Sequence, residues 1–176
     1  NVASIGTLGV KSNKFKKNLS NTTIDPILLS KILSKLKNKK IENVIMEASS
    51  HGLKQNRLDG LLFNLGIFTN LSQDHLDYHK NLKNYLNSKL YLFKNLIKKK
   101  GKVITDNEIP EFNKVKKISK NKDLDLYTLD DRKNNFKILS HTFNGESQIL
   151  KIKHNNFVQN INFKLIGKIQ LKNIIM

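Results

Sequence analysis

The spacing of apolar positions predicts that helices and strands alternate along this chain. Two apolar runs, Asn43–Met46 and Leu61–Thr69, are typical of strands in a parallel sheet, the second buried on both faces. Helical spacing predicts one helix from about Pro26 to Leu36, capped by Thr23 or Asp25, and another from Leu82 to Ile97. Their apolar faces consist of Ile27, Leu28, Ile32 and Leu36, and of Leu82, Leu86, Leu90, Phe93 and Ile97. The pattern predicts an α/β fold with a mostly parallel sheet flanked by helices.

The second half of the chain has a different pattern. Residues 102–104 return to the sheet, and residues 108–135 are charged and irregular, with one short strand expected near 126–129. Apolar and polar residues then alternate over 136–140, 148–153 and 160–165, with the turn-forming pair Asn144-Gly145 between the first two. We therefore expect a small antiparallel sheet near the C-terminus, and no site role for His141 or His154.

A polar loop rich in carboxylates, hydroxyls and imidazoles follows each of the two predicted parallel strands. Residues 47–57 read Glu-Ala-Ser-Ser-His-Gly-Leu-Lys-Gln-Asn-Arg, and residues 69–79 read Thr-Asn-Leu-Ser-Gln-Asp-His-Leu-Asp-Tyr-His, with Lys89 near the start of the next helix. Ligands of open α/β sheets gather beyond the carboxyl ends of the strands. We expect the two loops to meet at one sheet edge, where imidazoles, carboxylates and a lysine indicate a metal or phosphoryl-transfer site.

Both loops resemble signature segments of the central domain of the Mur ligases, ATP-dependent enzymes that form peptide bonds in cell-wall synthesis. Gly6-Thr7-Leu8-Gly9 and Asn21-Thr22-Thr23 fit the same family in the same order. Within the family, these motifs most resemble those of the member that adds the third peptide residue, usually meso-diaminopimelate, to UDP-N-acetylmuramoyl-L-alanyl-D-glutamate. The resemblance implies a nucleotide-binding α/β domain and an acyl-phosphate reaction, but it leaves open whether diaminopimelate or lysine is added.

The resemblance also implies roles for individual residues. Glu47 and His75 become magnesium ligands, and Lys89 becomes the lysine that carries a carbamate, whose anionic oxygen suits Mg²⁺. Two magnesium ions then bridge ATP and the acyl phosphate, and neutralise charge as the phosphoryl group moves. The residues implied to hold the UDP-muramoyl peptide are Asn21, Thr22, Thr23, Ser49, Gln55 and Arg57. His51 has a structural role as the first expectation and an orienting role as the alternative, and His79 is a weaker candidate ligand than His75.

Segments near the two ends depart from the family pattern. Residues 6–12 resemble a phosphate loop, but that loop requires glycines where Ile5 and Val10 stand. Residues 165–173 resemble the family's Gly-x-Phe-Asn-x-x-Asn segment, which lies near the nucleotide. Ile169 and Gln170 replace the Phe and the first Asn, so only Asn173 is expected to contact the nucleotide. Thr105-Asp106-Asn107 stands where the family has Asn-x-Asp. We expect a fragment that lacks the phosphate loop and both flanking domains and does not hydrolyse ATP by itself.

Two other functions compete with the ligase. A metal-dependent hydrolase could use Asp74, His75, Asp77 and His79, although such sites usually recruit further histidines. A net charge of +18 is compatible with a nucleic-acid-binding module. However, thirty of the 32 basic residues are lysines spread along the chain, and arginine, the better bidentate phosphate ligand, occurs twice. We therefore expect no specific nucleic-acid partner.

Composition sets the expected environment. No cysteine is present, which excludes disulfides and thiolate metal sites, and no apolar run approaches the length of a membrane span. Neither a leader nor a repeat is visible. We expect a cytoplasmic domain of a monomeric enzyme.

Overall fold

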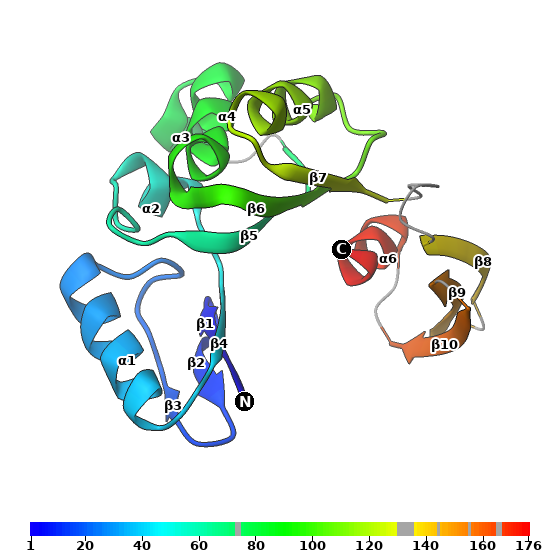
Figure 1. Ribbon diagram of the computed structural model, residues 1–176, viewed down its shortest axis with the longest axis horizontal. Coiled ribbons are helices and arrows are strands. Elements are labelled where there is room, and N and C mark those ends of the chain that lie inside the picture. The colour runs from blue at the N-terminus through cyan, green and yellow to red at the C-terminus, as the bar shows by residue number, and fades with distance from the viewer. Residues whose placement is uncertain (73–74, 130–135, 144, 155, 165–166) are drawn as a thin grey trace. The chain divides into compact units, whose positions relative to one another are not determined.

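The computed structural model describes residues 1–72, 75–129, 136–143, 145–154, 156–164 and 167–176 (Figure 1). They form two compact units, the first made of Asn1–Leu62 and Gln73–Leu96, and the second of Phe63–Ser72 and Ile97–Met176. Parallel strands, flanking helices and a small C-terminal antiparallel sheet are all present, so the predicted α/β class is confirmed. Among the described helices, none combines the length and the apolar character that crossing a membrane requires.

The first unit contains a four-stranded sheet whose order is β3-β2-β1-β4. Its strands are β1 (Val2–Gly6), β2 (Gly9–Ser12), β3 (Lys16–Lys17) and β4 (Asn43–Met46). β1 and β4 run parallel, and the Glu47 amide donates to the Ile5 carbonyl at 2.9 Å just beyond them. Their carboxyl ends therefore lie side by side, which brings the turn after β1 next to the loop after β4.

Helix α1 (Pro26–Asn38) begins where the sequence predicts. The Asp25 carboxylate caps it by accepting from the Leu28 amide at 2.9 Å, which confirms one of the two predicted caps. The buried face consists of Leu29, Ile32 and Leu36. Ile27 was expected on this face but is 70 % exposed, because the buried stripe is centred one residue further along the helix.

Three short helices and a π-helical turn complete the first unit. These are α2 (Ser50–Lys54), α3 (Leu76–His79), α4 (Leu82–Tyr91) and the π-helix Leu92–Leu96, and both α2 and α3 pack on α4. The prediction of a single helix from Leu82 to Ile97, with Lys89 near its start, was wrong. The backbone hydrogen bonds change from the α-helical to the π-helical pattern at Leu92. The α-helix therefore ends at Tyr91, and Lys89 lies in its last turn.

The second unit contains a parallel sheet of β5 (Phe63–Phe68), β6 (Ile97–Thr105) and β7 (Asp125–Thr128), in the order β5-β6-β7. Within the described residues β4 and β5 belong to different sheets, whereas the sequence predicted one. β5 is an edge strand, and Leu65 and Ile67 are each 41 % exposed. The expectation that β5 is buried on both faces was therefore wrong.

The charged segment after β6, which was predicted to be irregular, contains a helix. Helix α5 (Phe112–Asn121) packs on β7 and buries Val115 and Ser119. Lysines occupy much of the rest of its surface, so its apolar stripe is too narrow to stand out in the sequence.

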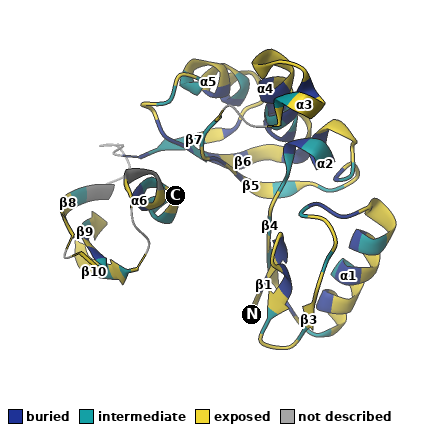
Figure 2. Ribbon diagram, turned by 180° about the vertical axis from the view of Figure 1, so that it is seen from behind, coloured by how far each residue is buried: buried dark blue, intermediate teal, exposed yellow. Residues whose placement is uncertain are grey.

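The predicted C-terminal antiparallel sheet is confirmed. It consists of β8 (Phe136–Phe143), β9 (Gln148–His154) and β10 (Phe157–Phe163), in the order β10-β9-β8, and helix α6 (Lys168–Ile175) follows. Leu150 is fully buried, while most of β10 is exposed (Figure 2). Asn144 of the predicted turn lies outside the described residues, and Gly145 adopts a positive φ of 89°.

Candidate active site

The Glu47 carboxylate lies directly after β4, beside the turn that follows β1. Its Oε2 atom accepts from the Thr7 amide at 2.6 Å and from the Thr7 hydroxyl at 2.8 Å. Within the part of the chain that the structure describes, the other carboxylate oxygen of this exposed side chain accepts no hydrogen bond. One oxygen is thus fixed by the protein, and the second can face a ligand.

Thr23 fastens the loop that carries Glu47. The buried Thr23 hydroxyl donates to the Glu47 carbonyl and accepts from the Ser49 amide, both at 2.9 Å. The Thr23 carbonyl accepts from Arg57 Nη1 at 2.6 Å. A Cβ atom on Gly52 would lie 2.5 Å from Thr23 Cβ, so only glycine allows this close packing. Thr23 therefore has a structural role in the loop, and its predicted contact with substrate stays a prediction.

The other predicted substrate ligands surround the same loop. Thr22 Oγ1 lies 2.9 Å from Thr7 Oγ1, and Asn21 beside it is exposed. Ser49 caps α2, its hydroxyl oxygen accepting from the Gly52 amide at 3.1 Å. Gln55, at the other end of α2, donates through Nε2 to the Tyr78 hydroxyl at 3.0 Å. Hydroxyl, amide and guanidinium groups are therefore gathered within one unit.

His75 begins α3 in the left-handed conformation, with φ 56° and ψ 26°, a region that histidine enters more often than most residues. Its side chain is exposed, and its ring centroid lies 5.0 Å from that of His51 in an edge arrangement. The His51 ring also lies 4.1 Å from the Tyr78 ring. The two predicted loops do converge, but through α2 and α3 rather than through adjacent strands of one sheet.

His79 is buried, with 3 % of its surface exposed. Nε2 lies 3.0 Å from the Ser50 hydroxyl, and Nδ1 lies 3.5 Å from the Ser88 hydroxyl. Because Ser88 donates to the Asn84 carbonyl at 2.9 Å, the Nδ1 side carries the imidazole proton and Ser50 donates to Nε2. Burial first, and then the nearby His51 and His75, hold the pKa of His79 below its usual value. His79 is thus a neutral structural histidine whose two nitrogens are occupied.

Lys89 is half-buried in α4, and its Nζ atom lies 5.3 Å from the centroid of the Tyr85 ring. Among the described residues, no group of three or more His, Cys, Asp and Glu side chains is arranged to hold a metal ion. A carbamylated Lys89 is not one of these four residue types, so its oxygens are not counted in such a group. The magnesium set of Glu47, His75 and Lys89 therefore stays a prediction.

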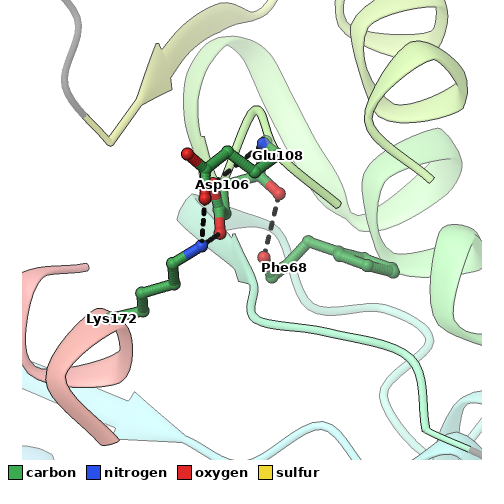
Figure 3. A network of polar contacts seen from close by, with 5 residues as sticks. Phe68, Asp106, Glu108 and Lys172 are labelled. Atoms are coloured by element: carbon green, nitrogen blue, oxygen red, sulfur yellow. Dashed lines mark hydrogen bonds and ion pairs between the residues drawn. The ribbon is translucent and has the colours of Figure 1, made fainter. Parts of the chain in front are cut away.

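A separate ion-paired cluster joins α6 to the end of β6 (Figure 3). Lys172 Nζ lies 2.5 Å from Asp106 Oδ2 and 2.7 Å from Glu108 Oε2. Hydrogen bonds to Asp106 and then Glu108 raise the pKa of Lys172, and burial opposes them. Asp106 is therefore committed to anchoring α6. Asn173, the next residue, is exposed, and its predicted contact with nucleotide stays a prediction.

The hydrolase alternative gains nothing from this geometry. His79 is committed to two serine hydroxyls, and Asp74 lies outside the described residues. Thr7, Ser50, Tyr78 and Ser88 take part in the contacts that build the site, and the sequence reading assigned none of them a role. The proximity of Thr7 could have been inferred from parallel pairing of β1 with β4.

Comparisons with known proteins agree with the family resemblance of the two loops. The model of the Mur ligase middle domain matches residues 1–176. A UDP-N-acetylmuramoyl-L-alanyl-D-glutamate--2,6-diaminopimelate ligase of Leptospira interrogans is 37 % identical over 178 residues, covering 98 % of this chain and 35 % of the relative. A ligase of the same name from Rickettsia montanensis is 36 % identical over 178 residues, covering 99 % and 37 %. The chain spans about a third of the length of these relatives.

Solved structures support the same fold. One described as a UDP-N-acetylmuramoyl-L-alanyl-D-glutamate--2,6-diaminopimelate ligase has a TM-score of 0.81 and 24 % identity, covering 99 % of this chain and 36 % of that chain. A mutant of L. casei FPGS has a TM-score of 0.61 and 15 % identity, covering 80 % and 33 %. None of these comparisons supports a hydrolase or a nucleic-acid-binding module. With the family model matched over residues 1–176 and the two signature loops meeting through α2 and α3, this chain belongs to the Mur ligase family, as a middle domain.

Proposed function

We propose that this chain works as the middle domain of an ATP-dependent ligase that adds meso-diaminopimelate to UDP-N-acetylmuramoyl-L-alanyl-D-glutamate in peptidoglycan synthesis. The observation that carries the proposal is the loop after β4. In eleven residues it supplies a carboxylate with one open oxygen, a hydroxyl and a guanidinium, all held in place by internal hydrogen bonds. The relatives that carry this ligase's name support the choice of substrates.

The residues present suit magnesium. Mg²⁺ prefers oxygen ligands and usually takes one or two carboxylates from the protein. Glu47 offers such an oxygen, His75 is exposed at the start of α3, and a carbamate on Lys89 adds a second anionic group. When bound, magnesium neutralises charge on the phosphoryl group that moves from ATP to the substrate carboxylate.

The protein's own groups hold the anionic substrate. The Ser49 oxygen accepts from Gly52, which leaves its proton for donation to a substrate oxygen. One Arg57 donor is bound to the Thr23 carbonyl, which fixes the guanidinium plane while its other donors suit a carboxylate or phosphate. Transfer of the terminal phosphoryl group produces ADP and an acyl phosphate. The amine of diaminopimelate then forms the amide bond and releases phosphate.

We also propose that the enzyme works in the cytoplasm as a monomer, and that Asn173 contacts the nucleotide. ATP and the nucleotide-linked precursor are soluble, charged molecules, which fits a cytoplasmic site of action. In the described structure Asn173 lies on the helix that Lys172 anchors to β6, so its position is fixed by that ion-paired cluster.

Lys89 provides the test of the proposed chemistry. In the intact gene product, Lys89→Ala should reduce substrate-dependent phosphate release by about 100-fold or more, because losing a ligand should cost at least as much as losing an outer group that orients one, which is about 10- to 100-fold. An added short-chain carboxylic acid should restore part of that activity, because it replaces the missing anionic oxygens. Lys83→Ala, an exposed lysine of the same helix, is the matched control and should behave as wild type. Unchanged activity in Lys89→Ala would contradict the carbamate role.

A further inference from the structure

Thr7 lies between the proposed metal ligand and the proposed substrate loop. Its backbone amide and its hydroxyl both bind Glu47 Oε2, and its hydroxyl also lies 2.9 Å from the Thr22 hydroxyl. Thr7 is 40 residues from Glu47 and 15 from Thr22 in the sequence. One exposed turn residue therefore connects the two parts of the site.

The proton of each hydroxyl can be assigned. A threonine hydroxyl has one proton and two acceptor lone pairs. Thr7 donates its proton to the Glu47 carboxylate, so the hydrogen bond between the threonines requires Thr22 to donate to Thr7. Thr22 consequently presents its hydroxyl to a ligand as an acceptor.

Gly6 makes this arrangement possible. A Cβ atom at position 6 would lie 2.6 Å from Glu47 Cδ, well inside contact distance. The carboxylate thus lies against the backbone at the end of β1, and the amide and hydroxyl of Thr7 both donate to one of its oxygens. Hydrogen bonds to a charged carboxylate are about twice as strong as those between neutral groups, and they fix its rotation.

We propose that Thr7 is a positioning residue: it holds Glu47 Oε2 so that Oε1 faces magnesium, and it makes Thr22 an acceptor for an N–H group of the substrate peptide. The assignment rests on the proposed function of Glu47 as a magnesium ligand. Outer groups that orient a metal ligand typically contribute 10- to 100-fold to metal affinity, so the effect should be measurable.

The test uses three variants of the intact gene product. Thr7→Val removes the hydroxyl but keeps the shape and the backbone donor, Thr7→Ser keeps the hydroxyl, and Thr142→Val alters an exposed threonine of β8 as a control. The first readout is the Kd for Mn²⁺, from the electron paramagnetic resonance signal of the free ion with a saturating non-hydrolysable ATP analogue. The second is the Mg²⁺ concentration for half-maximal phosphate release.

Thr7→Val should raise both quantities about 10-fold, while Thr7→Ser and Thr142→Val should match wild type. Thermal melting separates this effect from unfolding, since an exposed turn residue should change Tm little. Wild-type values for Thr7→Val, or an equal loss in Thr7→Ser, would overturn the assignment. If the wild-type protein itself shows no metal binding and no phosphate release, the proposed ligase function fails instead, so the two failures are distinguishable.

Discussion

The imidazole of His79 accepts a hydrogen bond from the buried Ser50 hydroxyl, with 3.0 Å between Nε2 and Oγ. This contact joins the end of α3 to the start of α2. On its other side the ring meets Ser88, the residue before Lys89, and it stacks on Tyr85 with 5.1 Å between ring centroids. His79 therefore holds together the elements that carry the proposed site.

Replacing His79 should destabilise the protein. In His79→Phe the ring remains similar in size, but the Ser50 hydroxyl loses its partner, while Ser88 keeps its bond to Asn84. A buried, unsatisfied hydroxyl costs roughly 1–3 kcal/mol, so the free energy of unfolding should fall by about 2 kcal/mol. Urea denaturation measures this value. His154→Phe, at an exposed histidine of β9, is the control, and an equal loss in both variants would refute the role of the buried pair.

The lowered pKa of His79 predicts the pH dependence of stability. The folded protein binds a proton at His79 more weakly than the unfolded chain, whose pKa is near 6.5. As pH falls through 6.5 the unfolded chain gains that proton first, so stability drops until the folded pKa is reached. The charged and titratable groups acting on His79 are His51, His75, Lys54 and Asp77, and only Asp77 opposes the shift. His79→Phe should have a flatter stability profile below pH 6.5; a slope equal to wild type would contradict this.

Lys172 should contribute strongly to the stability of the second unit. Lys172→Met leaves the Asp106 carboxylate, which is 2 % exposed, without its cation. Breaking a buried pair on one side costs about 3–5 kcal/mol, and partial exposure of Lys172 reduces the expected loss to about 2–3 kcal/mol. Chemical denaturation provides the measurement, with the exposed Lys164→Met as control. The double variant Asp106→Asn/Lys172→Met should lose less than the sum of the single losses; strict additivity would argue against direct pairing.

Gly6→Ala should impair metal use without unfolding the protein. The added methyl group would collide with the Glu47 carboxylate, the end of an exposed and flexible side chain that can move aside. This movement of the Glu47 carboxylate breaks its two hydrogen bonds to Thr7, so the Mg²⁺ concentration for half-maximal activity should rise about 10-fold. Thermal melting should show a small change in Tm. A large fall in Tm together with an unchanged Mg²⁺ requirement would contradict this explanation.

Local patterns in the sequence predict much of this fold. Asn43–Met46 is a strand with the predicted bounds, and the Asp25 cap, α1 and the C-terminal sheet follow from apolar spacing and turn residues. Helix α5 was missed because its buried side is narrow and its surface is rich in lysine. The end of α4 was misplaced because a change to π-helical bonding leaves the apolar spacing almost unaltered.

The candidate site divides in the same way. Clustering of the two loops was predictable, because Glu47 and His75 each stand in a recognisable motif that follows a predicted strand. The roles of Thr7 and His79 were not, since they depend on contacts between distant segments. Only the parallel register of β1 and β4 brings Thr7 to Glu47, and only burial distinguishes His79 from the exposed His75 four residues earlier.

The formation of the amide product tests the central claim most directly. Mass spectrometry of the reaction of the intact gene product with UDP-N-acetylmuramoyl-L-alanyl-D-glutamate, ATP, Mg²⁺ and diaminopimelate should detect the UDP-muramoyl tripeptide, formed in a one-to-one ratio with phosphate. Omitting any one of these components should abolish the product, and lysine in place of diaminopimelate should yield much less. Phosphate release without amide formation, or no reaction with all components present, would contradict the assignment of this chain to a diaminopimelate-adding ligase.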